Sequence, residues 1–127
     1  MTPTAAERDA LFRAFARALF KRDLDALYET VTPDFTWSTL DGEGRARLVT
    51  GRDAVAAQIA AGAGIYESQR FTDVVYHHLP EVSFMTFRVS EVLRGSGEQR
   101  EAVGVERYTF RDGRIALKDV YRKPVAA

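Results

Sequence analysis

Residues 99–123 read QREAVGVERYTFRDGRIALKDVYRK, and this stretch decides the fold. Apolar and polar side chains alternate along both arms, which is the period of a half-buried β-strand. The arms meet at Asp112-Gly113, a pair that favours the tight turn of a hairpin. The stretch therefore predicts two antiparallel strands, at about 99–111 and 114–123.

The same two-residue period extends backwards to about Ser68. It predicts two further strands, at 68–79 and 82–94, joined by the turn-forming residues His78-Leu79-Pro80-Glu81. Gly95-Ser96-Gly97 then joins the second of them to the hairpin. Because these connections are short, we expect neighbouring strands to pair antiparallel.

Helix signals occupy the first part of the chain. Thr4 and Glu7 form a capping box, because the hydroxyl can accept from the Glu7 amide while the carboxylate reaches back to Thr4. Asp23 can cap a second, short helix that stops at Pro33, since the residue before a proline is pushed out of helical geometry. Thr50, followed three residues later by an acid, opens a third helix.

A short strand is expected between the second and third helices. Residues 35–40 are aromatic and β-branched with alternation, and residues 41–44 have the composition of a turn. The whole pattern predicts a single α+β domain over residues 1–127, with three helices packed on one face of a long antiparallel sheet.

The basic side chains of the first helix lie mostly off its apolar stripe. Arg8, Arg13, Arg17 and Lys21 alternate with acids, so a solvated face is favoured over an anion site.

Composition excludes several classes of protein. The 127 residues carry 18 acids against 18 Lys plus Arg, and a net charge of zero argues against nucleic acid as a partner. The chain contains no cysteine, so it has no disulfide framework. No apolar run approaches the ~18 residues that span a bilayer. Glu7, Arg8 and Asp9 stand where a signal peptide would be apolar, so we expect a cytoplasmic protein without a membrane partner.

Three short motifs, in order and at fitting distances, resemble the nuclear transport factor 2-like superfamily. They are residues 23–27 with Pro33-Asp34-Phe35, residues 50–55, and residues 110–115. This superfamily includes ketosteroid isomerases, SnoaL-like polyketide cyclases and limonene epoxide hydrolase. The resemblance covers about Thr4 to Arg122 and implies a curved sheet and helices that form a cone around an apolar pocket.

The resemblance also implies positions for functional residues, and most of them have changed. The catalytic base of the isomerases falls at Thr39, the tyrosine of their oxyanion hole at Phe15, and the aspartate of the epoxide hydrolases at Val120. Only the second acidic residue of the isomerases' oxyanion hole is matched by an acid in this sequence, at Glu106. Isomerisation by the steroid isomerases' route is therefore not expected.

Glu106 is the first candidate for chemistry. It lies mid-strand on the face it shares with Tyr108, and burial among apolar side chains would suit a carboxylate to proton transfer. A two-residue turn would place Glu106 opposite Asp119, where two carboxylates can share a proton. A three-residue loop with a bulge at Gly113 would place it opposite Lys118 instead.

The two registers predict opposite inward faces for the last strand. The bulged form turns Lys118, Val120 and Arg122 inward, as the resemblance suggests, and we favour it. The alternative inward set contains Asp119 and is more apolar. A purely structural Glu–Lys or Glu–Arg pair explains the residues about as well.

The chain has only two histidines, His77 and His78, and adjacent strand residues point to opposite faces. One of them, more plausibly His77, would enter the pocket as acid or base, although a structural role is favoured. No metal site is expected, because the two cannot share one ion. No cofactor is expected either, since the chain lacks a dinucleotide-binding or phosphate-binding loop.

The predicted ligand is a small apolar or weakly polar molecule. Its pocket is expected to be lined by large side chains of both layers: Phe15, Trp37, His77, Met85, Phe87, Tyr108 and Arg122.

These residues predict a small-molecule pocket protein, in the first place an isomerase, cyclase or hydratase that needs no cofactor. Glu106 would act as acid or base, with Lys118 or Asp119 as its partner and Lys118 or Arg122 stabilising negative charge. The alternatives are a ligand carrier without activity and an association module. The latter would be a homodimer through the outer sheet face, where Arg88, Ser90, Arg107 and Thr109 lie.

Overall fold

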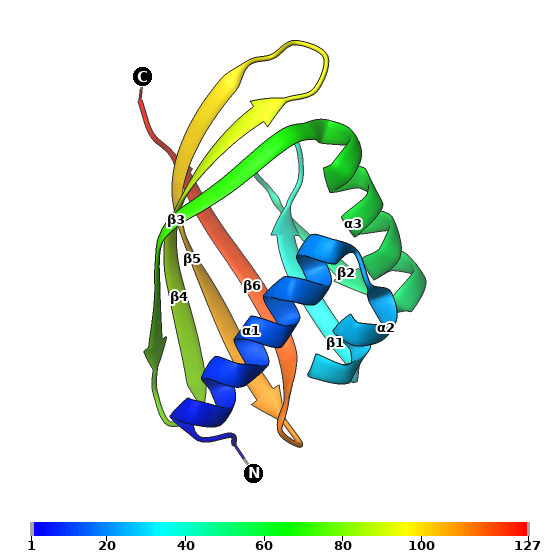
Figure 1. Cartoon of the computed structure of the whole chain (residues 1–127), viewed down its shortest axis with the longest axis vertical. Helices are drawn as coiled ribbons and strands as arrows, with labels where there is room; N and C mark the ends of the chain where they lie inside the picture. The colour runs from blue at the N-terminus through cyan, green and yellow to red at the C-terminus, as the bar shows by residue number, and fades with distance from the viewer. Residues whose placement is uncertain (1, 127) are drawn as a thin grey trace.

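The computed structural model describes residues 2–126, which form three helices and six strands (Figure 1). In chain order these elements are α1 (Ala5–Lys21), α2 (Leu24–Thr30), β1 (Val31–Leu40), β2 (Ala46–Thr50), α3 (Arg52–Ile65), β3 (Tyr66–His78), β4 (Val82–Leu93), β5 (Gln99–Arg111) and β6 (Arg114–Pro124).

The six strands form one sheet in the order β2-β1-β6-β5-β4-β3. The four strands from β3 to β6 pair antiparallel with their neighbours, as the short connections predict. β1 pairs parallel with β6, so the six-stranded sheet as a whole is mixed. This parallel pair brings Trp37 of β1 directly beside Lys118 of β6.

The first two helices begin where the sequence predicts. The Thr4 hydroxyl accepts from the Glu7 amide while the Thr4 amide donates to the Glu7 carboxylate, which completes the capping box. The Asp23 carboxylate accepts from the amide of Ala26 and caps α2. The third helix differs, because its N-cap is Gly51 (φ 92°) and no side chain of the described residues caps it. The Thr50 cap is therefore wrong.

β1 begins at Val31 instead of Phe35, and it includes Pro33. Pairing with β2 begins only at Thr36, and the pairing with β6 skips from Val31 to Thr36. Pro33 therefore lies in a stretch without ladder bonds, where its missing N–H costs nothing.

β2 was not predicted from the sequence. Of its five residues only Val49 is buried, while Leu48 is 71% exposed. An edge strand with one inward side chain has no alternation to detect.

The helices cover one face of the sheet, which we call the inner face. Figure 1 shows α1 crossing this face, while α2 and α3 lie beside β1 and β2, and the β4–β5 hairpin curls towards α3. The layers match the predicted α+β cone. Its core consists chiefly of aromatic and β-branched side chains: Phe12, Phe15, Leu27, Val31, Phe35, Val55, Phe87, Val89, Tyr108 and Ile115.

Candidate functional site

The β5–β6 hairpin sets which residues of β6 face inward. Asp112 and Gly113 form a two-residue turn with positive φ at both positions (54° and 76°), and Arg111 faces Arg114 across it. The register then shifts by one residue, because Ala116 is an extra residue of β6 opposite the junction of Thr109 and Phe110. The bulge therefore lies inside β6 and not at Gly113.

Neither predicted register is realised, but the favoured inward face is. Glu106 lies opposite Val120, with Lys118 and Arg122 one step away along the same face. Asp119 lies opposite Arg107 on the outer face, where it accepts from Arg107 Nε at 3.3 Å and from the Tyr121 hydroxyl at 2.8 Å. The pairing of Glu106 with Asp119 is therefore wrong, because the bulge at Ala116 turns Asp119 outward.

Glu106, Tyr108 and Lys118 form one buried group, which we call the Glu106 cluster. Lys118 Nζ lies 3.2 Å from Glu106 Oε1, and the Tyr108 hydroxyl donates to the same oxygen. Glu106 is 3% exposed and Lys118 is 8% exposed. Burying an ion pair costs desolvation energy that such contacts offset only partly, so this pair is weak as a stabilising element.

Both tyrosines near Glu106 are held in their protonated form. Burial, and then the negative charge of Glu106, raise the pKa of Tyr108 well above its usual value. The same two causes raise the pKa of Tyr76 to about 12. Tyr76 lies on the inner face opposite Met85, which lies opposite Glu106. Tyr76 was not predicted, although the alternation of its strand places it on the face opposite to His77.

Two aromatic rings border the ammonium group of Lys118. Its Nζ lies 5.4 Å from the ring centre of Phe15 and 5.2 Å from that of Trp37. Phe15 also meets Tyr108 edge to face, with ring centres 6.2 Å apart. The arrangement places a carboxylate, an ammonium group and a phenol among buried aromatic side chains where α1, β1, β5 and β6 meet. Such groups can move a proton and stabilise negative charge on a neutral ligand.

The sequence profile of the SnoaL-like domain matches residues 12–118, a span that contains the whole Glu106 cluster. The chain belongs to this family. Among curated protein sequences, none matches the chain.

Solved structures show that this SnoaL-like domain has the nuclear transport factor 2-like fold. A nuclear transport factor 2-like protein from Burkholderia xenovorans is 16% identical (TM-score 0.84), covering 94% of this chain and 92% of its own. A candidate polyketide cyclase from Xanthomonas campestris is 20% identical (TM-score 0.73, coverage 91% and 90%). A candidate isomerase from Bacillus subtilis is 16% identical (TM-score 0.74, coverage 93% and 87%). At these identities the likeness shows the fold alone.

A second ion pair, partly buried, lies nearer the end of the β4–β5 hairpin. Arg122 Nη1 lies 3.0 Å from Glu91 Oε2, and its guanidinium carbon lies 5.7 Å from the ring centre of Phe87. Gln69 also donates to this carboxylate. The Phe87 ring crosses β5 at Gly104, where a Cβ would lie 2.4 Å from Phe87 Cζ. Arg122 is therefore already paired inside the SnoaL-like domain.

A hollow of about 440 Å³ lies over β4, β5 and β6. Phe87 and Arg122 line it, whereas the other predicted ligand-binding residues do not. Most of the lining side chains belong to the outer face of the sheet, opposite to the inner face on which Glu106 lies. The full lining is Thr86, Phe87, Val103, Gly104, Val105, Tyr121, Arg122 and Lys123.

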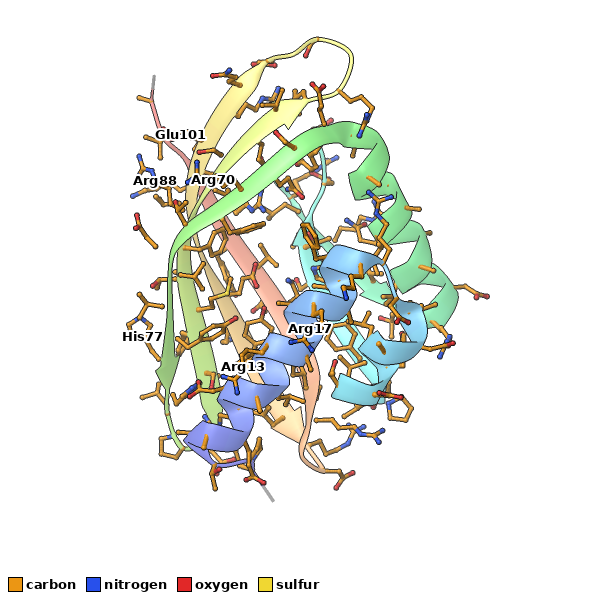
Figure 2. The ribbon with its side chains drawn as sticks, in the orientation of Figure 1. Arg13, Arg17, Arg70, His77, Arg88 and Glu101 are labelled. Atoms are coloured by element: carbon orange, nitrogen blue, oxygen red, sulfur yellow. The ribbon has the colours of Figure 1, made fainter. Side chains whose placement is uncertain are left out.

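The two histidines point to opposite faces, but the inward one is His78. His77 is exposed, and Figure 2 shows it projecting from β3 away from α1. Its Nε2 lies 3.3 Å from the Thr86 hydroxyl of the outer face. The prediction that His77 enters the pocket is therefore wrong. A bulge lies between Thr72 and Val75, where Asp73 has a φ of 53°, and it sets which of the following residues of β3 face inward.

His78 belongs to a polar group that ties α1 to the β3–β4 turn. Its Nε2 lies 2.8 Å from Asp9 Oδ1, and its Nδ1 lies 2.8 Å from the hydroxyl of Ser83, which is fully buried. Arg8 completes this group, which we call the Arg8 clamp.

Arg8 is 4% exposed, so the prediction of a solvated residue is wrong. Its guanidinium donates to the carbonyls of Pro3, Leu79, Pro80 and Val82 at 2.6 to 3.2 Å. It also donates to the Ser83 hydroxyl at 3.1 Å. Arg13 and Arg17, five and nine residues further along, project from α1 as predicted (Figure 2).

Within residues 2–126 no three His, Asp or Glu side chains gather as a metal site would require. No helix in this part of the SnoaL-like domain combines the length and hydropathy needed to cross a membrane.

Proposed function

We propose that this SnoaL-like domain binds a small, largely apolar molecule between its helices and its sheet. It would act on that molecule as an isomerase, cyclase or hydratase without a cofactor. The observation that carries the proposal is the Glu106 cluster, in which a carboxylate 3% exposed meets Lys118 Nζ at 3.2 Å inside an aromatic enclosure. A charged pair with so little stabilising value is better explained by chemistry than by folding.

Each member of the cluster has a separate role in the proposal. Glu106 takes a proton from the carbon next to a ligand carbonyl and returns it elsewhere. Lys118 stabilises the negative charge that develops on the ligand oxygen. Tyr108 stays protonated because its pKa is raised by burial, and its hydroxyl holds Glu106 in place.

The names of related structures support this class of reaction. Two of the three described above are candidates for a polyketide cyclase and an isomerase, two of the activities proposed here. The side chains that would shape the cavity here are Phe15, Trp37 and Met85, with Phe87 and Arg122 towards the hairpin.

Exchange of ligand protons with solvent tests the proposal without knowledge of the natural substrate. The probe is 2-tetralone, an apolar bicyclic ketone, whose α-protons are followed by NMR in D2O. We expect native protein to speed deuterium uptake and Glu106→Gln to reduce that catalysis at least about 100-fold, the usual contribution of a general base.

The matched control is Glu101→Gln, because Glu101 is an exposed acid of the same strand. It should exchange protons at the native rate. Unchanged exchange in Glu106→Gln would refute the assignment. Binding of the ketone without any catalysed exchange would instead favour a ligand carrier.

We also propose that the outer sheet face forms a homodimer. Tyr121 is 57% exposed beside the hollow described above, and the charged residues around it have both signs, so they can pair across a two-fold interface. Arg88, Ser90, Arg107 and Thr109 all lie on this face.

Sedimentation at tens of micromolar tests this second proposal. We expect a dimer for native protein and a monomer for Tyr121→Glu. Phe20→Glu is the control, because Phe20 is 87% exposed but lies on α1, away from the outer face. A native monomer would exclude the dimer at that concentration.

A further inference from the structure

The helix α3, at the border of the molecule in Figure 1, buries very little of itself. Of its fourteen residues only Val55 is buried, whereas α1 buries Arg8, Phe12, Phe15 and Ala18. Most other side chains of α3 are those of alanine and glycine, so moving it away from the sheet exposes little apolar surface. Segments with few buried apolar contacts open locally at low cost.

Polar contacts fasten α3 mainly at its two ends. At the start, Arg52 forms an exposed ion pair with Asp25 of α2. At the end, the carbonyl of Ile65 accepts from the amide of Arg94 at 2.9 Å. Between them, the amide oxygen of Gln58 is buried and takes no hydrogen bond from any described residue. Because water would satisfy this oxygen, outward movement of the helix gives it a hydrogen bond that the closed form lacks.

A narrow groove separates α3 from the junction of α1 and α2. Arg22 and Leu24 line it on one side, and Ala56, Ile59 and Ala60 of α3 line it on the other. Its volume is about 130 Å³, below the ~150 Å³ of a cavity that holds one benzene ring. Neither this groove nor the hollow on the outer face is lined by a residue of the Glu106 cluster. A ligand therefore reaches the cluster only after an element moves.

We propose that α3 is a lid, which moves away from the α1–α2 junction and admits the ligand through this groove. The inference rests on the proposed function in one respect, namely that the ligand occupies the interior around Glu106. Leu24 and Ile59, which line the groove, also pack against the core, so the groove leads towards that interior. Gly51 (φ 92°), at the start of the helix, can absorb the change in backbone angles that the movement requires.

Hydrogen exchange tests the movement itself, without any ligand. Relative to their intrinsic rates, the amides of residues 56–61 should exchange at least about 100-fold faster than those of residues 12–18 in α1. The helix α1 is the reference, because the Arg8 clamp and the aromatic core fasten it. Equal protection of the two helices would overturn the lid.

A reversible cross-link tests whether the movement admits the ligand. The chain has no cysteine, so Arg22→Cys/Ala60→Cys carries just two thiols, one on each side of the groove. A flexible bis-methanethiosulfonate reagent joins them, and reduction releases them. The probe is 2-tetralone, whose association is followed in stopped flow by the fluorescence of Trp37, the only tryptophan. We expect the cross-link to slow association at least about tenfold, and reduction to restore the native rate.

The matched control is Asp34→Cys/Arg111→Cys. Its cross-link joins β1 to β5 at an exposed ion pair, and neither residue lines the groove. It should leave association at the native rate.

The outcomes separate this inference from the proposed function. An unchanged rate in the cross-linked groove variant, or equal slowing in both variants, would overturn the lid and leave the interior site standing. Binding of the ketone without catalysed proton exchange would remove the proposed reaction, and the effect of the cross-link on association would still decide the lid. Absence of ketone binding to native protein would overturn both.

Discussion

The inner face carries two buried polar groups of opposite character, the Arg8 clamp and the Glu106 cluster. In the clamp a single guanidinium donates five hydrogen bonds, four of them to main-chain carbonyls. In the cluster both contacts of Glu106 converge on Oε1, and the neighbouring indole N–H has no partner among residues 2–126. Complete pairing to the main chain indicates a structural role, whereas incomplete pairing among aromatic rings indicates a place for a ligand.

The largest expected effect is on the clamp. Arg8→Ala leaves four carbonyls and the Ser83 hydroxyl without their donor, so we expect the free energy of unfolding to fall by about 3 kcal/mol or more. Urea denaturation measures it. Arg13→Ala, an exposed neighbour on the same helix, should change the value by less than about 0.5 kcal/mol. Equal effects at the two positions would refute the structural role of the clamp.

The cluster should tolerate a paired replacement. In Glu106→Gln/Lys118→Met the buried charges disappear together, so we expect stability within about 1 kcal/mol of native protein. The same variant should lose catalysed proton exchange. If urea denaturation showed a loss as large as that of Arg8→Ala, the cluster would be structural and the contrast between the two groups would fail.

Tyr76 lies between the two groups, and its titration gives a smaller effect. Burial, together with the charges of Glu106 and Asp9, raises its pKa from 10 to about 12. The unfolded chain therefore releases this proton at lower pH, and stability present below pH 10 is lost as the pH rises towards 12. We expect Tyr76→Phe to recover less than about 1 kcal/mol at pH 11, since Tyr76 is partly solvated. Urea midpoints at pH 9 and 11 measure it, and an identical pH dependence in both proteins would contradict it.

The smallest effect belongs to an exposed ion pair outside both groups. Hydrogen bonds from Arg111 lower the pKa of Asp34 from 3.8 to about 2. The contribution is present above pH 3.8 and is lost as the pH falls towards 2. Asp34→Asn should therefore be slightly less stable than native protein at pH 5 and nearly equal to it at pH 2. Thermal unfolding at the two pH values measures the difference in stability between Asp34→Asn and native protein. A difference that grew larger in acid would contradict the prediction.

The sequence contains enough information for the layers and the long strands. Alternation along residues 68–123 and the caps at Thr4 and Asp23 are local signals, and the structure follows them. The parallel pairing of β1 with β6 depends on residues far apart in the chain, which leave no local pattern. The edge strand β2 pairs with its neighbour in the chain, but only Val49 of its five residues is buried, so it shows no alternation.

The types of residue in the site were predictable from the sequence, but the strand register that brings them together was not. Alternation turns Glu106 and Tyr108 to one face, but a single extra residue at Ala116 decided that Lys118 and not Asp119 joins them. Gln58 was missed because a glutamine on an alanine-rich helix has no sequence signature of an unpaired atom. Arg8 was wrongly predicted to be exposed for a related reason, since its partners are carbonyls of a turn that is distant in the sequence.

The central claim is that the interior around Glu106, and not the hollow on the outer face, receives the ligand. A crystal structure of native protein soaked with 2-tetralone tests it most directly. The account predicts the ketone oxygen within about 3.5 Å of Lys118 Nζ, with its ring against Trp37 and Phe15. A ketone bound only in the hollow beside Tyr121, with the Glu106–Lys118 contact unchanged, would contradict it.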